Sequence, residues 1–346
     1  MLHRGDCART AIRHDFPMAK INWGILGTAK IAVNKVIPAL QKSSLGAVVA
    51  IASRDAAKAG AVATQLGIPR AHDSYEALLA DPGIDAVYIP LPNHLHVPWS
   101  LQALAAGKHV LCEKPIALHA REAAELAAAA TKYPQLKIME AFMYRFHPQW
   151  LRAREITAGG GIGELRAMHS HFSYWNVDPN NIRNQGAIGG GGMMDIGCYC
   201  VSFARWLYGT EPRRVLGLVE MDPAFGTDRL ASGLLDFGRG TATFTCSTQL
   251  SPFQRANIFG TEGRLEIEIP CNAPPDKPTR LWHQRGATIT EIAFEICDQY
   301  TLQADAFARA ILNDTPVPTP LADAVGNMRT IEALLASARS GTWLTP

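Results

Sequence analysis

The sequence predicts an α/β protein: a doubly wound parallel sheet, followed by an α+β domain with a large, mostly antiparallel open sheet. The chain has 346 residues, which is long for a single hydrophobic core. Residues 21–139 alternate short apolar runs with helix-length segments, a pattern typical of parallel strands joined by right-handed crossovers. Beyond residue 160, strand-like runs follow one another with few helices between them, which favours antiparallel pairing. We therefore expect a disordered tail over 1–19, a first domain over 20–142 and a second over 143–346.

The elements of both domains follow from apolar periodicity and from turn residues. In the first domain, strands are expected over 21–26, 47–53, 86–91, 109–112 and 137–139. Its helices are expected to end near residue 41 and to span 56–66, 97–106 and 120–130. In the second domain, strands are expected over 165–174, 214–221, 230–237, 241–248, 256–260 and 265–269. Its helices are expected over 148–157, 193–208, 300–312 and 321–339.

Composition excludes several classes of protein. A net charge of +2, without a basic block, gives no electrostatic reason to expect nucleic acid or an acidic membrane as partner. The seven cysteines are scattered without the spacing of a zinc or redox motif, so we expect buried thiols and no metal site. No apolar stretch approaches the roughly 20 residues that span a bilayer, and residues 1–17 lack a signal-peptide core. A cytoplasmic protein is expected, with the tail disordered or arising from a start codon ahead of Met18.

The first motif with chemical meaning lies where the first strand meets the first helix. It reads Gly27-Thr28-Ala29-Lys30-Ile31. A strand, tight turn and helix present backbone N–H groups to a dinucleotide pyrophosphate, although only the first glycine of the G-x-G-x-x-G fingerprint remains. An ordinary strand–helix turn is the alternative, but the position at the first βα junction favours dinucleotide binding.

The end of the second strand predicts which dinucleotide binds. Ser53 and Arg54 stand where NAD-binding units usually carry an acidic residue, and Lys58 follows one turn later. A hydroxyl and a guanidinium suit a 2′-phosphate, so NADP is expected rather than NAD. Asp55 lies one residue beyond the position typical of NAD binding, and a solvated Arg54 is the alternative.

Two further segments indicate proton transfer. Lys114 follows a strand directly and precedes a proline, at the edge of an open α/β sheet where ligands bind. Downstream, four glycines at 189–192 lead into a predicted helix on which Asp195 and Tyr199 stand four residues apart, so they should share one face. A carboxylate and a phenol presented together suit acid–base chemistry. The alternatives are a charged loop residue and a structural Tyr–Asp hydrogen bond.

Together these segments resemble the glucose–fructose oxidoreductase/inositol dehydrogenase (Gfo/Idh/MocA) family from about residue 21 to the C-terminus. The most specific segments are AGKHVLCEKP at 106–115 and GGGMMDIGCY at 190–199, and the others lie at 27–32, 90–96 and 144–145. Within that family the chain is most similar to the aldose dehydrogenases and the dimeric dihydrodiol dehydrogenases. That branch has a tyrosine where inositol dehydrogenases carry histidine, and this chain has Tyr199.

The resemblance implies a Rossmann domain, an open sheet that often forms a dimer interface, and a set of site residues. Tyr199 would be the general acid/base, with Lys114 beside it and Asp195 orienting the site. The Lys114 ammonium and an oxidised nicotinamide would both lower the phenol's pKa from about 10. The further cofactor contacts implied are Pro90, Leu91, Asn93, His96, Glu113 and Arg145. The further substrate contacts are Trp175, Asn181 and Arg183.

Several of these positions have a structural alternative. Arg145 could instead form a surface ion pair, Trp175 could fill core, and Asn181 and Arg183 could only shape their loop. The leading hypothesis is an NADP-dependent dehydrogenase that oxidises a cyclic aldose to its lactone and forms a homodimer or homotetramer through the second sheet. A dihydrodiol dehydrogenase or sugar-ketone reductase with the same site is the enzymatic alternative. A non-enzymatic NADP-sensing regulator is the alternative of another class, against which an intact proton-transfer set argues.

Overall fold

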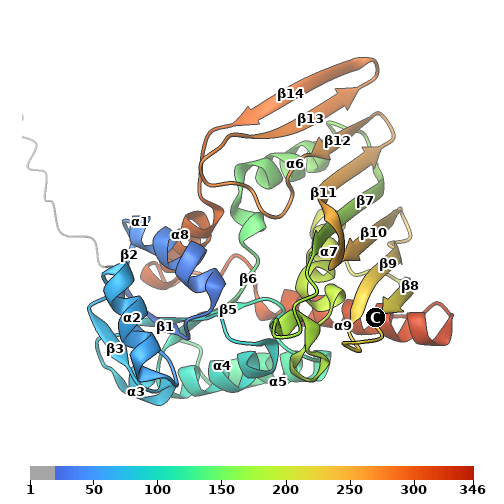
Figure 1. Ribbon diagram of the computed structural model, residues 1–346. Coiled ribbons are helices and arrows are strands. Elements are labelled where there is room, and N and C mark those ends of the chain that lie inside the picture. The colour runs from blue at the N-terminus through green and yellow to red at the C-terminus, as the bar shows by residue number, and fades with distance from the viewer. Residues whose placement is uncertain (1–19) are drawn as a thin grey trace, which may run out of the picture.

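The computed structural model describes residues 20–346, so the expectations for residues 1–19 lie outside the described residues. A parallel sheet with its helices stands beside a large second sheet (Figure 1). The fold class predicted from the sequence is confirmed.

The first sheet has six parallel strands in the order β3-β2-β1-β4-β5-β6, which is the order of a dinucleotide-binding Rossmann sheet. Its strands are β1 (Ile21–Leu26), β2 (Gly46–Ala52), β3 (Arg70–His72), β4 (Ala86–Ile89), β5 (His109–Glu113) and β6 (Ile138–Ala141). Its helices are α1 (Ile37–Lys42), α2 (Ala56–Leu66), α3 (Tyr75–Ala80), α4 (His96–Ala105) and α5 (Ala120–Ala130). The sequence did not predict β3 and α3, because three half-exposed residues and a six-residue helix are too short for a periodic signal.

The strand order reverses between β1 and β4, and ligands bind beyond the carboxyl ends of strands at such a switch point. β1 ends at Leu26 and is followed by Gly27, while β4 ends at Ile89 and is followed by Pro90. The two segments expected to hold the cofactor therefore lie on neighbouring strands.

The second sheet has eight strands in the order β14-β13-β12-β11-β7-β10-β9-β8. They are β7 (Leu165–Trp175), β8 (Arg214–Met221), β9 (Asp228–Asp236), β10 (Thr241–Ser247), β11 (Gln249–Gly260), β12 (Gly263–Ile267), β13 (Thr279–Arg285) and β14 (Thr288–Phe294). All neighbours pair antiparallel except β7 and β10, which are parallel. The hairpin of β13 and β14 was not predicted, because β14 is mostly exposed and carries polar residues between its apolar ones.

The remaining helices place the site between the two sheets. They are α6 (Pro148–Ala158), α7 (Cys198–Tyr208), α8 (Gln299–Leu312) and α9 (Leu321–Ser340). The predicted helix 193–208 begins with a π-helical segment, Met193–Gly197, before α7. Although α8 comes late in the chain, it packs against α1, and Phe307 contacts Trp23 of β1 at 5.8 Å between ring centroids. The boundary at residues 142–143 stays a prediction.

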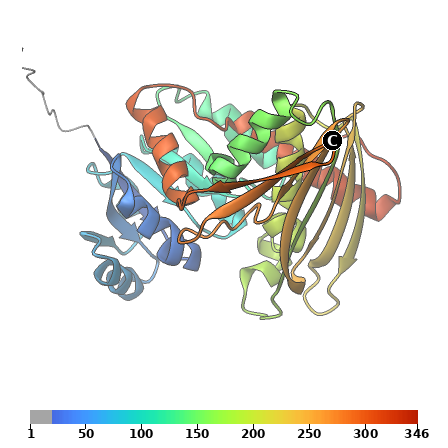
Figure 2. The same cartoon turned by 90° about the horizontal axis from the view of Figure 1, so that it is seen from above.

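The two faces of the second sheet differ. Helices α7 and α9 pack against one face, and the core lies between them and the sheet; Figure 2 views the sheet nearly along its edge. The strand register places Leu218, Phe253, Phe259 and Ile289 on the other face, where they are 72%, 50%, 37% and 58% exposed. This second face has no helix of the described chain over it.

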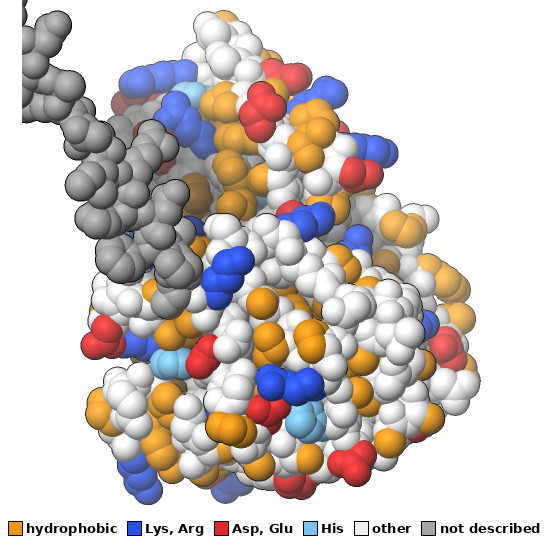
Figure 3. Space-filling view, turned by 90° about the vertical axis from the view of Figure 1, so that its left-hand side faces the viewer, with side chains coloured by type: hydrophobic (Ala, Val, Ile, Leu, Met, Phe, Trp, Pro, Cys, Tyr) orange, Lys and Arg blue, Asp and Glu red, His pale blue; other side chains and the backbone are white. Residues whose placement is uncertain are grey.

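On the face that Figure 3 shows, acidic and basic side chains are interspersed. None of the helices in residues 20–346 is long and apolar enough to cross a membrane. In the same residues, no three His, Cys, Asp or Glu side chains are grouped as metal ligands, and the six cysteines are free thiols.

Candidate active site

The turn after β1 is shaped for a close approach of a ligand to the backbone. Gly27 has φ +109°, and a Cβ there would lie 2.9 Å from Leu91 Cδ2. Within residues 20–346, no group accepts a hydrogen bond from the N–H groups of Thr28 and Ala29. Lys30 and Ile31 continue into a π-helical segment, Ala32–Val36. The turn therefore fits the pyrophosphate of a dinucleotide, since it presents free donors at a helix start.

The residues after β2 lie as a 2′-phosphate site requires. Ser53 is buried, whereas Arg54 and Lys58 are exposed. The Asp55 carboxylate accepts from the Lys58 N–H at 3.1 Å and so caps α2, which occupies the acidic group that could otherwise have bound a ribose. Burial raises the pKa of the Tyr75 phenol, which the sequence analysis missed, and the nearby Arg54 guanidinium partly offsets that rise.

The segment after β4 joins the two domains. Pro90 and Leu91 are buried, and the Asn93 amide donates to the Gly189 carbonyl at 2.7 Å. His96 is fully buried, and its ring nitrogens lie 2.7 Å from the carbonyl oxygens of Leu91 and Pro115. Burial lowers the pKa of His96 to about 4. The cofactor contact of His96 stays a prediction, and the ring itself is enclosed by protein.

Lys114 leaves the end of β5 toward the second domain. The preceding Glu113 carboxylate accepts from the Tyr88 hydroxyl at 2.6 Å. Lys114 Nζ donates to the Asp195 backbone carbonyl at 2.6 Å and to Asp195 Oδ1 at 3.2 Å. Burial lowers the pKa of Lys114, but Asp195, Cys198 and Glu113 together outweigh burial and hold that pKa above its ordinary value. Lys114 and Asp195, which the sequence analysis assigned to one site, are in contact in the structure.

The other carboxylate oxygen of Asp195, Oδ2, accepts two further hydrogen bonds. Tyr174 donates to Asp195 Oδ2 at 2.6 Å, and Arg183 Nε donates to the same atom at 2.8 Å. Burial raises the pKa of Asp195, yet the cations Lys114 and Arg183 bring it well below its usual range, so the group is a carboxylate. Burial and this carboxylate raise the pKa of the Tyr174 phenol. Tyr174 was missed, although alternation along β7 places it on the inward side with Phe172.

Tyr199 is placed differently from the prediction. Its ring packs against Phe142 and Phe172, and its hydroxyl donates to Met143 Sδ at 3.3 Å. Lys114 Nζ lies over the ring, 5.0 Å from its centroid. The expected lowering of the phenol's pKa is not found, because burial raises it well above 10. The Asp195 carboxylate and the Tyr199 ring both contact the Lys114 ammonium, although the segment that begins this helix is π-helical.

The glycine segment before Tyr199 is held by a residue that the sequence analysis missed. The Asp228 carboxylate of β9 accepts from the Met193 N–H at 2.5 Å. Gly191 has φ +119°, and a Cβ there would collide with Asp228 Oδ1. Burial raises the pKa of Asp228 to about 7, although the N–H groups at the helix start lower it. No sequence pattern pairs these residues, because they come from different strands and loops.

The remaining predicted residues divide between the site and its surroundings. The Arg145 guanidinium is buried and contacts Ser202 Oγ and Asp323 at 2.7 Å each. The predicted alternative of a surface ion pair is therefore wrong, and these contacts add no support for a cofactor contact. Trp175 is 63% exposed, which excludes a core position. Asn181 accepts from the Arg183 N–H and shapes their loop.

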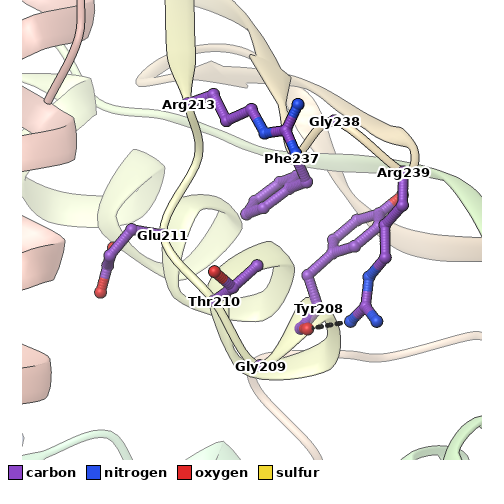
Figure 4. Close-up of a pocket in the computed structure, with 8 residues that line it drawn as sticks. All are labelled: Tyr208, Gly209, Thr210, Glu211, Arg213, Phe237, Gly238 and Arg239. Atoms are coloured by element: carbon purple, nitrogen blue, oxygen red, sulfur yellow. Dashed lines mark hydrogen bonds between the residues drawn. The ribbon is translucent and has the colours of Figure 1, made fainter.

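One hollow on the described surface lies away from this site. It has a volume of about 440 Å³ and lies at the far end of α7, between Tyr208, Arg213 and Phe237 (Figure 4). Tyr208 and Phe237 stack there, and the Arg239 guanidinium is bound to the Tyr208 carbonyl. The hollow therefore lies at the opposite end of the helix from Tyr199.

A dinucleotide turn, a buried lysine–carboxylate pair and a phenol beside them define the class of a nicotinamide-dependent oxidoreductase. Residues 21–141 match the family model "Oxidoreductase family, NAD-binding Rossmann fold", and residues 150–266 match the GFO/IDH/MocA C-terminal domain. The chain belongs to the GFO/IDH/MocA family of oxidoreductases. The resemblance seen in the sequence is confirmed.

The relatives include enzymes of several related activities. The chain is 42% identical to D-xylose 1-dehydrogenase (NADP(+)) 2 of Haloferax volcanii, over 92% of this chain and 98% of the relative. It is 33% identical to human trans-1,2-dihydrobenzene-1,2-diol dehydrogenase, over 76% and 79%. Among solved structures, aldose-aldose oxidoreductase from Caulobacter crescentus has a TM-score of 0.87 at 27% identity, over 94% and 100%. The 3-ketoreductase KijD10 from Actinomadura kijaniata, in complex with NADP and TDP-benzene, has 0.86 at 29%, over 92% and 98%.

Proposed function

We propose that this protein is an NADP-dependent oxidoreductase that transfers hydride between the C1 hydroxyl of a cyclic aldose and the nicotinamide, giving a lactone. The observation that carries the proposal is the arrangement of Lys114, Asp195 and Tyr199, in which one ammonium contacts both a carboxylate and a phenol ring. The similarity to an NADP-dependent D-xylose dehydrogenase along almost the whole chain supports this substrate class.

The protein's own groups prepare the proton transfer. A bound nicotinamide supplies the hydride acceptor or donor. Asp195 holds the Lys114 ammonium by two contacts, and that ammonium provides a charge-assisted donor for a substrate oxygen. Tyr199, on the other side of Lys114, is the group proposed to exchange a proton with the same oxygen. Arg183 is 40% exposed and bonds Asp195 only through Nε, so its terminal nitrogens are proposed to bind substrate hydroxyls.

NADP is the cofactor that the turn after β2 supports. Arg54 is exposed and Ser53 lies beside it, while the nearby carboxylate of Asp55 is engaged in capping α2. An Arg with no acidic neighbour free to bind a ribose 2′-hydroxyl favours the 2′-phosphate.

Reduction of a ketone at the same site is the second candidate, and the state of Tyr199 favours it. Because burial raises the pKa of the phenol well above 10, the hydroxyl keeps its proton at neutral pH. A protonated phenol donates to the oxygen of a carbonyl that receives hydride, whereas oxidation first requires its loss. The likeness to a 3-ketoreductase agrees with this direction.

The exposed face of the second sheet supports a homodimer or homotetramer. Large apolar side chains at Leu218, Phe253, Phe259 and Ile289 are rarely left facing water over one sheet face in a monomer. Light scattering at micromolar concentration should give a dimer or tetramer mass. A monomer mass would contradict this assembly.

A substrate screen tests the function directly. Purified protein is assayed with cyclic aldoses, inositols and dihydrodiols plus NADP, and with sugar ketones plus NADPH, following absorbance of the reduced cofactor. Aldose oxidation with NADP is the expected result. Activity on ketones alone would favour the second candidate, and NADPH binding without turnover on any class would favour a sensor.

A further inference from the structure

Two buried side chains that the proposed reaction does not use contact the Pro115–Ile116 peptide unit, one at its carbonyl and one at its N–H. His96 of α4 lies 2.7 Å from the Pro115 carbonyl oxygen. Glu140 of β6 accepts from the Ile116 N–H through Oε1, also at 2.7 Å. His96 is 0% exposed and Glu140 1%, so neither contact competes with bulk water. With its single proton on Nδ1, the neutral His96 ring donates to the Pro115 carbonyl, so the Pro115–Ile116 peptide is held at its carbonyl and at its N–H.

A carboxyl group at the buried position of Glu140 lowers the stability of the fold. Its Oε2 is buried and has no hydrogen-bond partner among the described residues. Burial and Asp323 of α9 raise its pKa to about 8, while Arg145 and Arg205, the latter from α7, lower it. The thiols of Cys112 and Cys198 also face this carboxyl. An apolar residue would avoid this cost, since a buried carboxyl with an unpaired oxygen destabilises a fold.

We propose that Glu140 is a positioning residue for Lys114: with His96 it fixes the Pro115–Ile116 peptide and so sets where the ammonium meets Asp195. This inference rests on the proposed function, because it concerns the lysine of that site. Lys114 lies two residues from the gripped N–H, and its Nζ must stay within 2.6 Å of the Asp195 carbonyl. A misplacement of about 1 Å lowers turnover by up to about 100-fold.

The carboxyl also predicts a pH dependence. An ionised oxygen accepts a hydrogen bond more strongly than a neutral one, so the grip on Ile116 tightens as Glu140 loses its proton. Turnover should therefore rise through a limb near pH 8. A glutamine at this position keeps an acceptor oxygen but has no proton to lose.

Two substitutions separate the hydrogen bond from the burial. Glu140→Leu removes the acceptor, and Glu140→Gln keeps it. The Leu variant should lose roughly 10–100-fold in turnover, with NADP affinity within about twofold of the parent. The Gln variant should stay within about threefold and lack the limb near pH 8. Gln303→Leu is the matched control, because Gln303 is equally buried, has an unpartnered oxygen, and lies on α8.

Hydrogen exchange of a peptide that contains the Ile116 amide supplies a readout independent of activity. Exchange should be faster in Glu140→Leu than in the parent, and unchanged in Glu140→Gln and Gln303→Leu. Unchanged exchange in Glu140→Leu, or equal losses of turnover in both Glu140 variants, overturns the proposal. Failure of the substrate screen would instead remove the proposed function and leave the exchange result to decide whether Glu140 holds the turn.

Discussion

Two glycine turns in this molecule have similar backbone conformations but differ in whether their N–H groups have hydrogen-bond acceptors. Each holds a glycine at positive φ, Gly27 at +109° and Gly191 at +119°, and each leads into a π-helical segment. At the first turn, the N–H groups of Thr28 and Ala29 have no acceptor within residues 20–346. At the second, the Gly191 N–H donates to the Arg183 carbonyl, and the N–H of Met193 donates to Asp228.

This difference between the turns suits the first to binding an anion and the second to positioning the residues that follow it. A helix start with free donors attracts an anion from solution, which suits a cofactor phosphate. A helix start already closed by an internal carboxylate binds no ligand, and instead fixes the residues that follow it. In this protein those residues are Asp195 and Tyr199. The same local construction therefore serves cofactor binding in one domain and the proposed chemistry in the other.

The largest expected effect concerns the phenol of Tyr199, which follows the second turn. Tyr199→Phe should lower turnover by roughly 10²–10⁴-fold, the usual contribution of a positioned acid–base group. Thermal stability should hardly change, because the hydroxyl bonds only the Met143 sulfur. Tyr208→Phe, at the other end of α7, is the control. If Tyr199→Phe keeps its turnover and Tyr174→Phe loses it, the proton-transfer phenol is the one bound to Asp195.

The next effect concerns the internal carboxylate that closes the second turn. Asp228 has a pKa of about 7 in the fold against about 3.9 unfolded, so the folded state holds the proton more tightly. The contribution of Asp228 to the free energy of unfolding is then greatest below about pH 4 and falls as pH rises toward 7. Between pH 5 and 8 the parent should lose about 2–3 kcal/mol of unfolding free energy that Asp228→Asn does not lose. Parallel urea-unfolding curves for both proteins would count against the closed turn.

A smaller effect tests the ligand expected at the first domain. Arg54→Ala should weaken NADP binding by about 10–100-fold, as expected for a charge-assisted contact, and leave NAD binding nearly unchanged. Titration of each cofactor, followed by fluorescence, measures both affinities. Equal losses for the two cofactors would place the 2′-phosphate elsewhere. Lys30→Ala is a useful comparison, because Lys30 is also exposed but lies at the other turn.

The smallest effect compares the two turns directly. Gly27→Ala should cost roughly 1–2 kcal/mol of stability because it places a side chain at positive φ, and Gly191→Ala should cost more because its Cβ also collides with Asp228. Gly27→Ala should weaken NADP binding, and Gly191→Ala should lower turnover with little change in binding. Gly192→Ala is the comparison at negative φ, since its φ of −65° suits alanine, although its Cβ would lie 3.3 Å from Asp228 Oδ2 and requires a small shift of that carboxylate. Identical changes in both functions for the two variants would mean that the turns do not differ as proposed.

Much of the first domain could be predicted from the sequence because its signals are local. The bounds of β1, α2 and α5 agree with the prediction to the residue, since each is one apolar run or one amphipathic stretch between clear turn residues. The assignment of Lys114, Asp195 and Tyr199 to one site relied on resemblance to a family. Short or exposed elements such as β3 and β14 carry too weak a pattern to be found.

The sequence by itself determined the two-domain fold class, the family and the residue types of the site. Only the tertiary structure decided how those residues meet. Tyr174, Arg183 and Asp195 converge from a strand, a loop and a helix start, and Asp228 comes from another strand to close that start. Distances between groups far apart in the chain are set by packing, which local propensity does not encode.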